Sequence, residues 1–323
     1  MTGHILLTFD IEDWFQVENL KACIPFSSWG SRELRVEKTT HRILDLLDSW
    51  DGRDGGDLHK REDGTDLDHA RNQVGGAGSV LRPGTKITAT FFVLGWVAKR
   101  LPQLVREIHS RHHEIASHGY HHRLCTECTA KDLRSDLTES RKLLEDLIGE
   151  QVYGYRAPSF AVNEDILKTI EECGYSYDSS WNTFALHGRY GKVNLSGRYR
   201  KGIAFPVSKG FFELPISNIK MVGQTLPWGG GGYFRLMPLP FFRLGVRWIL
   251  RKEKAYVFYM HPWEMDPGQP RVNGASKFHR FRHYVNLCKT HSKFSEFLGE
   301  VKECQFLSCQ DYIEQIVVDS KGV

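Results

Sequence analysis

The sequence predicts an α/β fold in which helices pack around a parallel sheet or barrel. Short continuous apolar runs, which read as buried strands, alternate along the chain with longer segments whose apolar residues recur at helical spacing. The first of these runs ends abruptly in acidic residues, as a buried strand does where it meets a functional loop. With 323 residues, 41% of them hydrophobic and 25% charged, the chain can bury a sizeable core as one large barrel or two modest domains.

The first part of the chain is expected to contribute two strands, one helix and an insertion. Residues 5–9 form the first apolar run, residues 34–50 carry a helical pattern, and residues 87–94 form the second run. Between them, residues 51–84 contain eight glycines and twelve charged residues but no Phe, Trp, Tyr, Ile or Met. Because such a segment cannot bury much core, we expect a disordered insertion, with an ordered functional lid as the alternative.

The alternation continues to residue 178 and is less regular beyond it. Helices are expected at residues 97–108, 133–147 and 165–173, and strands at residues 113–117, 152–156, 174–178, 211–216 and 255–260.

Charge, hydropathy and cysteine content narrow the class of protein. The formal net charge of +4 is small and is not gathered into a basic run, so no nucleic-acid partner is expected. No secretory signal or transmembrane segment is visible, and three arginines make residues 234–250 suit an amphipathic helix. We therefore expect a cytoplasmic protein, free or peripheral to the inner membrane. Seven cysteines without framework spacing indicate reduced thiols, and a zinc or redox role for the CxxC pair Cys125 and Cys128 is a minor alternative.

Two polar clusters follow predicted strands and indicate metal chemistry. Asp10, Glu12 and Asp13 end the first strand, whereas His118 and His122 follow a later one. A spacing of four would let one helical turn aim both imidazoles at one point. Two histidines with a carboxylate and water make a catalytic zinc site, and a further carboxylate would be left to act as general base. A surface histidine cluster and a solvated acidic turn are the alternatives.

Four stretches of sequence carry a further signal, and the first two of them contain these residues. They are Thr8-Phe9-Asp10-Ile11-Glu12-Asp13, Ser117-His118-Gly119-Tyr120-His121-His122, Tyr155-Arg156-Ala157-Pro158-Ser159-Phe160 and Phe258-Tyr259-Met260-His261-Pro262-Trp263-Glu264. In this order they resemble successive motifs of the polysaccharide deacetylase (NodB-homology) family. Asp178-Ser179-Ser180 and residues 226–235 and 281–287 further resemble its exosortase- and exopolysaccharide-associated branch, which has a C-terminal extension. The resemblance covers nearly the whole chain except residues 51–84.

The resemblance implies a distorted (β/α) barrel with fewer than eight regular units and a site at the C-terminal ends of its strands. It implies that Asp10 is the general base, that Arg156 contacts this base, and that His261 is the general acid, which Glu264 could orient. A structural ion pair for Arg156 and a buried structural role for His261 are the alternatives.

The resemblance also assigns the metal ligands. His118 and His122 would bind a divalent metal, which we expect to be zinc. Glu12 and Asp13 are both available as the third ligand, and Asp13 is slightly favoured.

Aromatic residues beside the motifs are expected to contact the sugar, although core packing is an equal alternative for each tryptophan and for Tyr233. The candidates for substrate binding are Tyr155, Pro158, Phe160, Trp228, Tyr233 and Trp263.

Together with the resemblance, these residues predict a metal-dependent hydrolase that removes N-acetyl groups from amino sugars of an exopolysaccharide or its lipid-linked precursor. Residues 1–265 would form the catalytic barrel, and residues 266–323 an extension packed on it. One alternative is hydrolysis of another C–N bond, in a formamide or a cyclic ureide. Another is a catalytically inactive carbohydrate-binding protein, which would not need the acid and base residues that this chain retains.

Overall fold

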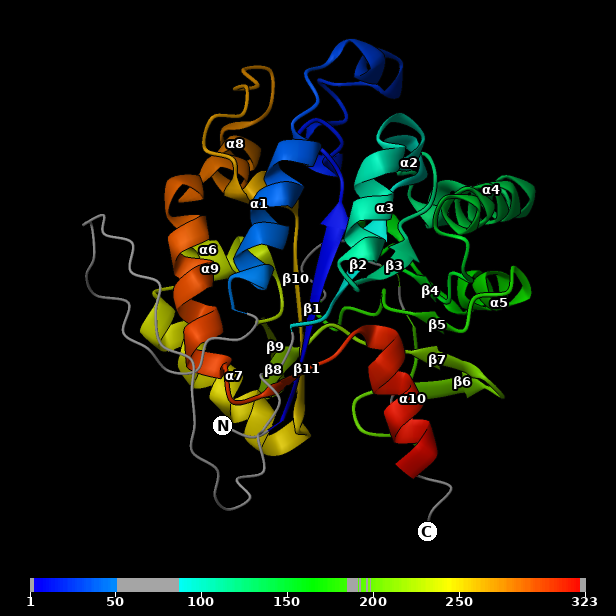
Figure 1. The fold of residues 1–323 in the computed structure, drawn as a ribbon, viewed down its shortest axis with the longest axis vertical. Helices are drawn as coiled ribbons and strands as arrows, with labels where there is room; N and C mark the ends of the chain where they lie inside the picture. The colour runs from blue at the N-terminus through cyan, green and yellow to red at the C-terminus, as the bar shows by residue number, and fades with distance from the viewer. Residues whose placement is uncertain are drawn as a thin grey trace, which may run out of the picture.

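The computed structural model describes residues 3–50, 87–184, 191, 193–195, 197 and 199–319 of the chain (Figure 1). The insertion expected at residues 51–84 lies outside the described residues, so both interpretations of it stay predictions.

The described residues form strands, α-helices and short 3-10 helices. The strands are β1 (His4–Ile11), β2 (Ala89–Val93), β3 (Glu114–Ser117), β4 (Gly154–Tyr155), β5 (Tyr177–Asp178), β6 (Phe205–Ser208), β7 (Phe211–Glu213), β8 (Asn218–Met221), β9 (Gln224–Pro227), β10 (Ala255–Met260) and β11 (Gln305–Phe306). The α-helices are α1 (Val36–Asp48), α2 (Gly95–Arg100), α3 (Pro102–Ser110), α4 (Ala130–Ile148), α5 (Glu164–Glu172), α6 (Gly231–Leu236), α7 (Leu239–Glu253), α8 (Lys277–Tyr284), α9 (Leu287–Val301) and α10 (Cys309–Asp319). The 3-10 helices are η1 (Glu18–Leu20), η2 (Phe26–Ser31), η3 (Cys125–Glu127), η4 (Pro158–Phe160) and η5 (Pro262–Met265).

One curled sheet organises the fold. Its strand order is β10-β1-β2-β3-β4-β5-β7-β6, and β11 pairs with the beginning of β1. Neighbours are parallel from β10 to β7, and only β6 joins this path antiparallel. Within the described residues the path ends at β10 and β6 without closing, so the sheet is an open half-barrel with helices outside it (Figure 1). The predicted distorted (β/α) barrel is confirmed.

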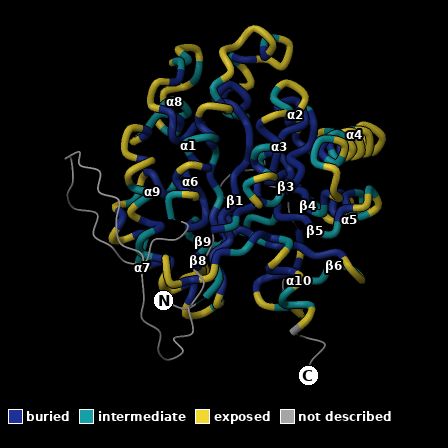
Figure 2. Tube along the Cα trace, in the orientation of Figure 1, coloured by how far each residue is buried: buried dark blue, intermediate teal, exposed yellow. Residues whose placement is uncertain are grey.

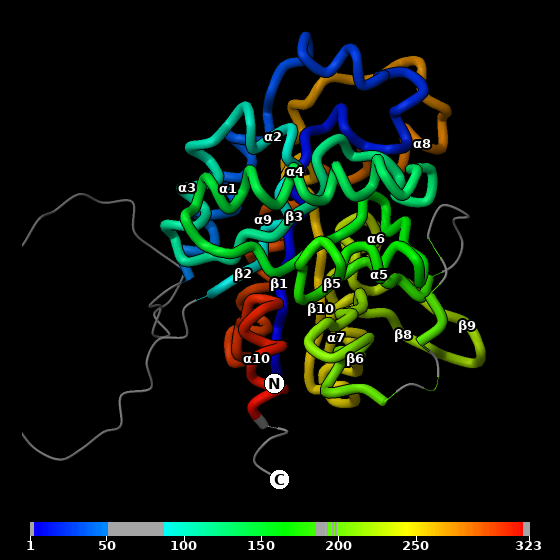
Figure 3. Tube along the Cα trace, turned by 90° about the vertical axis from the view of Figure 1, so that its right-hand side faces the viewer, coloured from blue at the N-terminus to red at the C-terminus, as the bar shows by residue number. Residues whose placement is uncertain are grey.

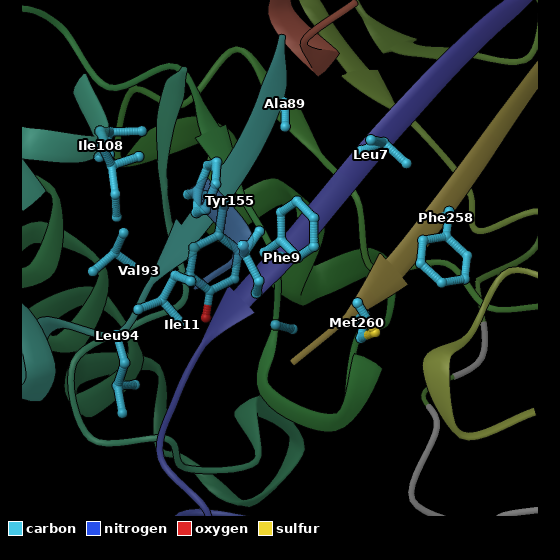
Figure 4. Packing of buried hydrophobic residues seen from close by; sticks show 14 of the residues in the cluster. Leu7, Phe9, Ile11, Ala89, Val93, Leu94, Ile108, Tyr155, Phe258 and Met260 are labelled. Carbon is cyan, nitrogen blue, oxygen red and sulfur yellow. The ribbon is translucent and has the colours of Figure 1, made fainter. Parts of the chain in front are cut away.

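Side chains along β1 alternate between the apolar core outside the sheet and the interior of the barrel. Leu7, Phe9 and Ile11 belong to the large apolar cluster between the sheet and its outer helices (Figure 4). Thr8 and Asp10 point to the opposite face, because successive strand residues face opposite sides of a sheet. Figure 2 shows the central strands buried and the outer faces of helices such as α4 exposed. The central strand therefore presents a carboxylate to the barrel interior.

Two helical predictions need correction. The helix expected at residues 97–108 is two helices, because Leu101 has a non-helical backbone and Pro102 starts α3, where a proline needs no amide hydrogen. The helical turn expected for His118 and His122 is a loop, in which Gly119 has φ +72° and His122 has φ +53°. Both histidines are still brought together, but by a left-handed turn rather than by a helix face.

The C-terminal residues join the same core as the barrel. β11 pairs with β1 through His4 and Ile5, and Phe294 of α9 stacks on Phe258 of β10 with ring centroids 5.8 Å apart. A domain boundary at residue 265 stays a prediction. In the described part of the chain, no helix has the length and apolar character needed to cross a membrane.

Candidate active site

The predicted site residues gather at the C-terminal ends of neighbouring strands. Asp10 lies near the end of β1, while His118, Arg156 and His261 directly follow β3, β4 and β10. These strands run parallel, so their C-terminal ends meet at one edge of the sheet, which is the edge toward which β1 points in Figure 1.

Glu12, His118 and His122 form a cluster that can hold a metal ion. One ligand atom from each lies within 4.8 Å of the others, and all three residues are buried. The Nδ1 atom of His118 lies 2.8 Å from the carbonyl oxygen of Arg156, so it donates a hydrogen bond there and leaves Nε2 as the ligand atom. The Nε2 atom of His122 lies 2.6 Å from Oε2 of Glu12. Two imidazoles and one carboxylate in a buried space fit a divalent ion such as zinc.

The protonation states of His118 and Glu12 suit metal binding. Burial alone would lower the pKa of His122, but the charge of Glu12 raises it, so this imidazole must release its proton when a metal binds. Burial lowers the pKa of His118 to about 4, so its imidazole is neutral at neutral pH, as a ligand must be. Burial alone would raise the pKa of Glu12, but the charges of His122 and His261 lower it to about 2. Glu12 is therefore an ionised carboxylate over the whole range in which the protein would work.

The preference for Asp13 as third ligand is not supported by the geometry. Oδ1 of Asp13 accepts the amide hydrogen of Trp14, while Oδ2 accepts those of Arg35 and Val36 at 2.7 and 2.9 Å. Both oxygens are thus occupied at the N-terminus of α1, where an anionic side chain satisfies otherwise unpaired amides. Asp13 holds the loop after β1 against α1, and Glu12 points to the histidines.

Asp10 and Arg156 form a buried ion pair on one side of the cluster. Nη1 of Arg156 lies 2.7 Å from Oδ1 of Asp10 and also donates to the hydroxyl of Thr8 at 2.8 Å. The other guanidinium nitrogens donate to the carbonyl and hydroxyl oxygens of Ser179, and the guanidinium lies 4.0 Å from the ring centroid of Phe92. Arg156 has no exposed surface, so its guanidinium plane is fixed. Because the guanidinium holds Oδ1 of Asp10, the other oxygen, Oδ2, faces the cavity.

His261 also lies beside the cluster and is held by a chain of charged groups. Its Nδ1 lies 2.9 Å from Oε1 of Glu264, whose Oε2 accepts from Nε of Arg235 at 2.7 Å. Nε2 of His261 therefore faces the site, 3.9 Å from Oδ2 of Asp10 and 3.4 Å from Oε1 of Glu12. Burial alone would lower the pKa of His261, but the charges of Glu12 and Glu264 and the hydrogen bond to Glu264 raise it to about 9. The imidazole is thereby kept as a proton donor at neutral pH.

Arg235 connects the acid to the C-terminal part of the chain. Besides Glu264, it donates to the carbonyl oxygens of Arg282, His283 and Val285, at distances of 2.7 to 3.0 Å. This role was not predicted from the sequence, in which Arg235 only ends the stretch 226–235 that resembles the exopolysaccharide-associated branch, because its partners are far away along the chain.

A stack of rings forms one wall of the site. Trp263 lies between His261 and His283, with ring centroids 5.1 and 4.3 Å away, and its Nε1 donates to Oε1 of Glu12 at 3.3 Å. Burial lowers the pKa of His283 to about 3, and Nε2 of its neutral ring pairs with Gln269 at 2.7 Å. His283 was another residue whose role sequence reasoning missed.

The site opens into a cavity of about 130 Å³ that contains only some of the predicted substrate-binding residues. Phe160, Tyr233 and Trp263 line it, together with Asn19 and Tyr259, which the sequence analysis did not single out. Pro158 precedes this wall in η4 without lining the cavity.

Two predicted substrate contacts are core residues instead. Tyr155 is fully buried, and its hydroxyl lies 3.3 Å from Sγ of Cys125. Trp228 packs under α7, where its Nε1 donates to the carbonyl oxygen of Phe242 at 2.8 Å. The contact with Tyr155 leaves Cys125 as a buried thiol, and none of the seven cysteines, each of them a described residue, is part of a disulfide.

Comparison with known proteins gives this site a family context. Residues 82–177 match the family described as Polysaccharide deacetylase, and residues 179–314 match a domain of unknown function, DUF3473. The chain is 31% identical over 90 residues to a peptidoglycan-N-acetylglucosamine deacetylase of Bacillus cereus. It is 32% identical over 90 residues to a chitooligosaccharide deacetylase of Sinorhizobium fredii. Each match covers 28% of this chain and 42% of the relative, so the chain spans less than half the length of these curated relatives.

Solved structures show the same fold at low sequence identity. A crystal structure of a candidate polysaccharide deacetylase from Mycobacterium smegmatis aligns with 98% of this chain and 91% of its own, at 19% identity and a TM-score of 0.56. That of Puue allantoinase aligns with 95% of this chain and 86% of its own, at 14% identity and a TM-score of 0.52. Residues 82–177 therefore match the polysaccharide deacetylase family, and the chain shares its overall fold with these solved structures.

Proposed function

We propose that this protein is a divalent-metal-dependent hydrolase that removes the acetyl group from N-acetylated amino sugars of an exopolysaccharide or its lipid-linked precursor. One observation carries the proposal. A buried carboxylate held by Arg156 and an imidazole held by Glu264 face each other 3.9 Å apart, beside the Glu12, His118 and His122 cluster and in the same cavity. Hydrolysis of an unactivated amide needs a base, an acid and an electrophile together, whereas a carbohydrate-binding protein needs none of them.

The metal would be held by Glu12, His118 and His122, and zinc is the ion that this donor set favours. When bound, such an ion polarises the amide carbonyl and lowers the pKa of water.

Asp10 is the general base in this proposal. Arg156 occupies Oδ1, so Oδ2 is the oxygen available to accept a proton from the attacking water. Two further hydrogen bonds from Arg156 to Ser179 hold the guanidinium in place, so the carboxylate keeps this orientation. Asp10→Asn should keep the metal ligands intact and lower kcat by about 10²- to 10⁴-fold.

His261 is the general acid. Since Nδ1 is hydrogen-bonded to Glu264, the proton that reaches the departing sugar amine comes from Nε2, which faces the cavity. Trp263 supports the ring from behind. His261→Ala should therefore harm substrates with basic leaving amines most, and those with weakly basic leaving amines least.

The proposal is tested by incubating zinc-loaded protein with N-acetylated oligosaccharides and lipid-linked amino sugars while acetate and formate are measured. Acetate release that Asp10→Asn abolishes supports deacetylation. Formate release, or turnover of a cyclic ureide alone, would instead assign the site to another C–N bond. Sugar binding without any hydrolysis would make the chain an inactive carbohydrate-binding protein.

A further inference from the structure

The rim of the catalytic cavity carries an exposed apolar helix face that the proposed reaction does not use. In α8, Phe278 and Phe281 are 60% and 58% exposed. At roughly 100° per residue they lie about 60° apart on the helix surface, so they form one face. In α8 only His283 is buried, so these phenylalanines do not serve the core.

Basic residues flank this face on both sides. By the same helical geometry Lys277 borders Phe281 and Arg282 borders Phe278, each at about 40°. The guanidinium of Arg282 lies 5.8 Å from the ring centroid of Phe278. Residues 267–286 contain four lysines and arginines and no Asp or Glu. An apolar helix face bordered by cations, in a stretch of sequence without acidic residues, is typical of helices that lie on an anionic lipid surface.

This face is joined directly to the active site. Arg282 and His283 line the catalytic cavity, and the backbone carbonyls of both accept hydrogen bonds from Arg235, which also holds Glu264. α8 stands at the edge of the molecule toward which the strands of the barrel point (Figures 1 and 3). A surface that contacts α8 therefore also lies close to the mouth of the site.

A second rim segment strengthens this geometry. Phe26 of η2 is 47% exposed. The chain segments that carry η2 and α8 pack closely against each other at Cys23 and Gly274. A Cβ atom added to Gly274 would lie only 3.2 Å from Sγ of Cys23. The two segments also meet where Arg35 pairs with both carboxylate oxygens of Asp266.

We propose that the α8 face, defined as Phe278, Phe281, Lys277 and Arg282, docks on an anionic phospholipid bilayer. The cavity then opens toward the membrane surface and takes an N-acetylated amino sugar carried on a lipid diphosphate. The docking stands on the α8 face alone, whereas this choice of substrate class rests on the proposed function.

A second copy of the chain fits this face less well than a bilayer. In a two-fold dimer the same surface meets itself, so the cations of α8 would oppose each other without any acidic residue in residues 267–286 to pair with them. Anionic lipid headgroups attract such cations, and phenylalanines can enter the layer below the headgroups.

α7 offers the matched control. It exposes Leu244 and Trp248 by 62% and 41%, but its Arg243 lies within hydrogen-bond distance of Glu300, and Arg247 lies 3.5 Å from the same residue. α7 leads into the beginning of β10 and lies in Figure 1 at the end of the strands opposite to the site.

The docking is tested by flotation of the full chain with vesicles of phosphatidylcholine, with or without phosphatidylglycerol. Wild type should bind the anionic vesicles and release them at high salt. Phe278→Asn with Phe281→Asn should weaken binding by roughly tenfold or more, and Leu244→Asn with Trp248→Gln should bind like wild type. Absence of wild-type binding, or loss of binding only in the α7 variant, overturns the docking. A dimer in solution that the α8 variant abolishes would make the face a contact between copies.

The substrate class is tested with zinc-loaded protein on two substrates. One is polyprenyl-diphosphate N-acetylglucosamine in the same vesicles, and the other is a free N-acetylated trisaccharide. The α8 variant should lose roughly tenfold in kcat/KM on the vesicle-borne substrate and keep wild-type turnover of the trisaccharide. Turnover of the trisaccharide alone by wild type overturns the lipid-linked substrate. Vesicle binding without turnover of either substrate refutes the proposed hydrolase and leaves the docking intact.

Discussion

Replacing Glu12 and Asp13, the two adjacent acidic residues after β1, by their amides in two single variants should separate metal binding from stability. The two carboxylate oxygens of Asp13 accept three backbone hydrogen bonds. In Asp13→Asn one of these oxygens becomes an NH2 group, which cannot accept, so at least one backbone N–H loses its partner. Leaving such a buried donor unpaired costs about 1–3 kcal/mol, and loss of the charge at the start of α1 adds about 0.3–1 kcal/mol. A loss of about 2–3 kcal/mol in a protein of this size lowers Tm by roughly 3–4 °C.

Glu12→Gln should show the opposite pattern. Its carboxylate lies beside His122 and accepts from Trp263, and an amide of the same shape removes the charge that a divalent ion requires. Zinc affinity should fall by roughly tenfold or more. Tm measured with a chelator present should fall less than in Asp13→Asn, because His122 can release its proton once its anionic partner is gone.

The two variants are compared by competition for zinc with a chromophoric chelator and by thermal unfolding with and without metal. Asp13→Asn should bind zinc like wild type and melt earlier in both states. If Asp13→Asn instead loses zinc affinity while its metal-free Tm stays unchanged, Asp13 is a ligand and the role assigned to Glu12 is refuted.

Three further predictions address the core, the acid and the pH dependence. Trp228→Ala should lower the free energy of unfolding by about 3–5 kcal/mol, whereas Tyr233→Ala should mainly raise KM for oligosaccharides. Equal Tm values for the two variants would contradict the placement of Trp228 in the core and of Tyr233 at the cavity. Arg235→Met leaves Glu264 without its buried partner, so it should lower the free energy of unfolding by about 3–5 kcal/mol and also lower kcat at full zinc occupancy. An unchanged kcat would show that Arg235 does not position the general acid. Burial raises the pKa of Glu114 to about 7 from an ordinary value of 4.5, so its stabilising contribution is complete below pH 4.5 and is lost as pH rises through 7. Relative to Glu114→Gln, wild type should therefore lose about 2 kcal/mol between pH 5 and 8 in urea unfolding, and a gain would reverse the sign.

The fold was predictable because its central strands are buried on both faces. Residues 5–9, 87–94 and 255–260 read as continuous apolar runs, and they became the three adjacent strands β1, β2 and β10. The break at Pro102 was visible in the sequence, but the helical periodicity on both sides of it concealed two helices. Periodicity reports which residues are buried, and it does not report a change in helix direction.

Most of the candidate site was predictable from the types of residue at strand ends. Asp10, His118, His122, Arg156 and His261 lie at one edge of the sheet, as the resemblance implied. The support for His261 was less visible, because Arg235 and the backbone carbonyls of residues 282–285 meet only in the folded chain. Contacts between segments so distant in sequence leave no local pattern to read.

The third ligand could have been predicted by extending the strand argument one step further. A strand places every second side chain on the same face, so Thr8 and Asp10 share the interior face of β1, and Glu12 has the same parity. β1 continues to Ile11, so this parity still applies where the acidic group begins, and Asp13 falls on the other side. There Asp13 meets the first amides of α1, which need an acceptor, whereas Glu12 meets two imidazoles. Two neighbouring carboxylates thus acquire different tasks from one alternation. The same reasoning predicts that inserting a single residue within β1 before Glu12 would disrupt the metal site even if every ligand were retained.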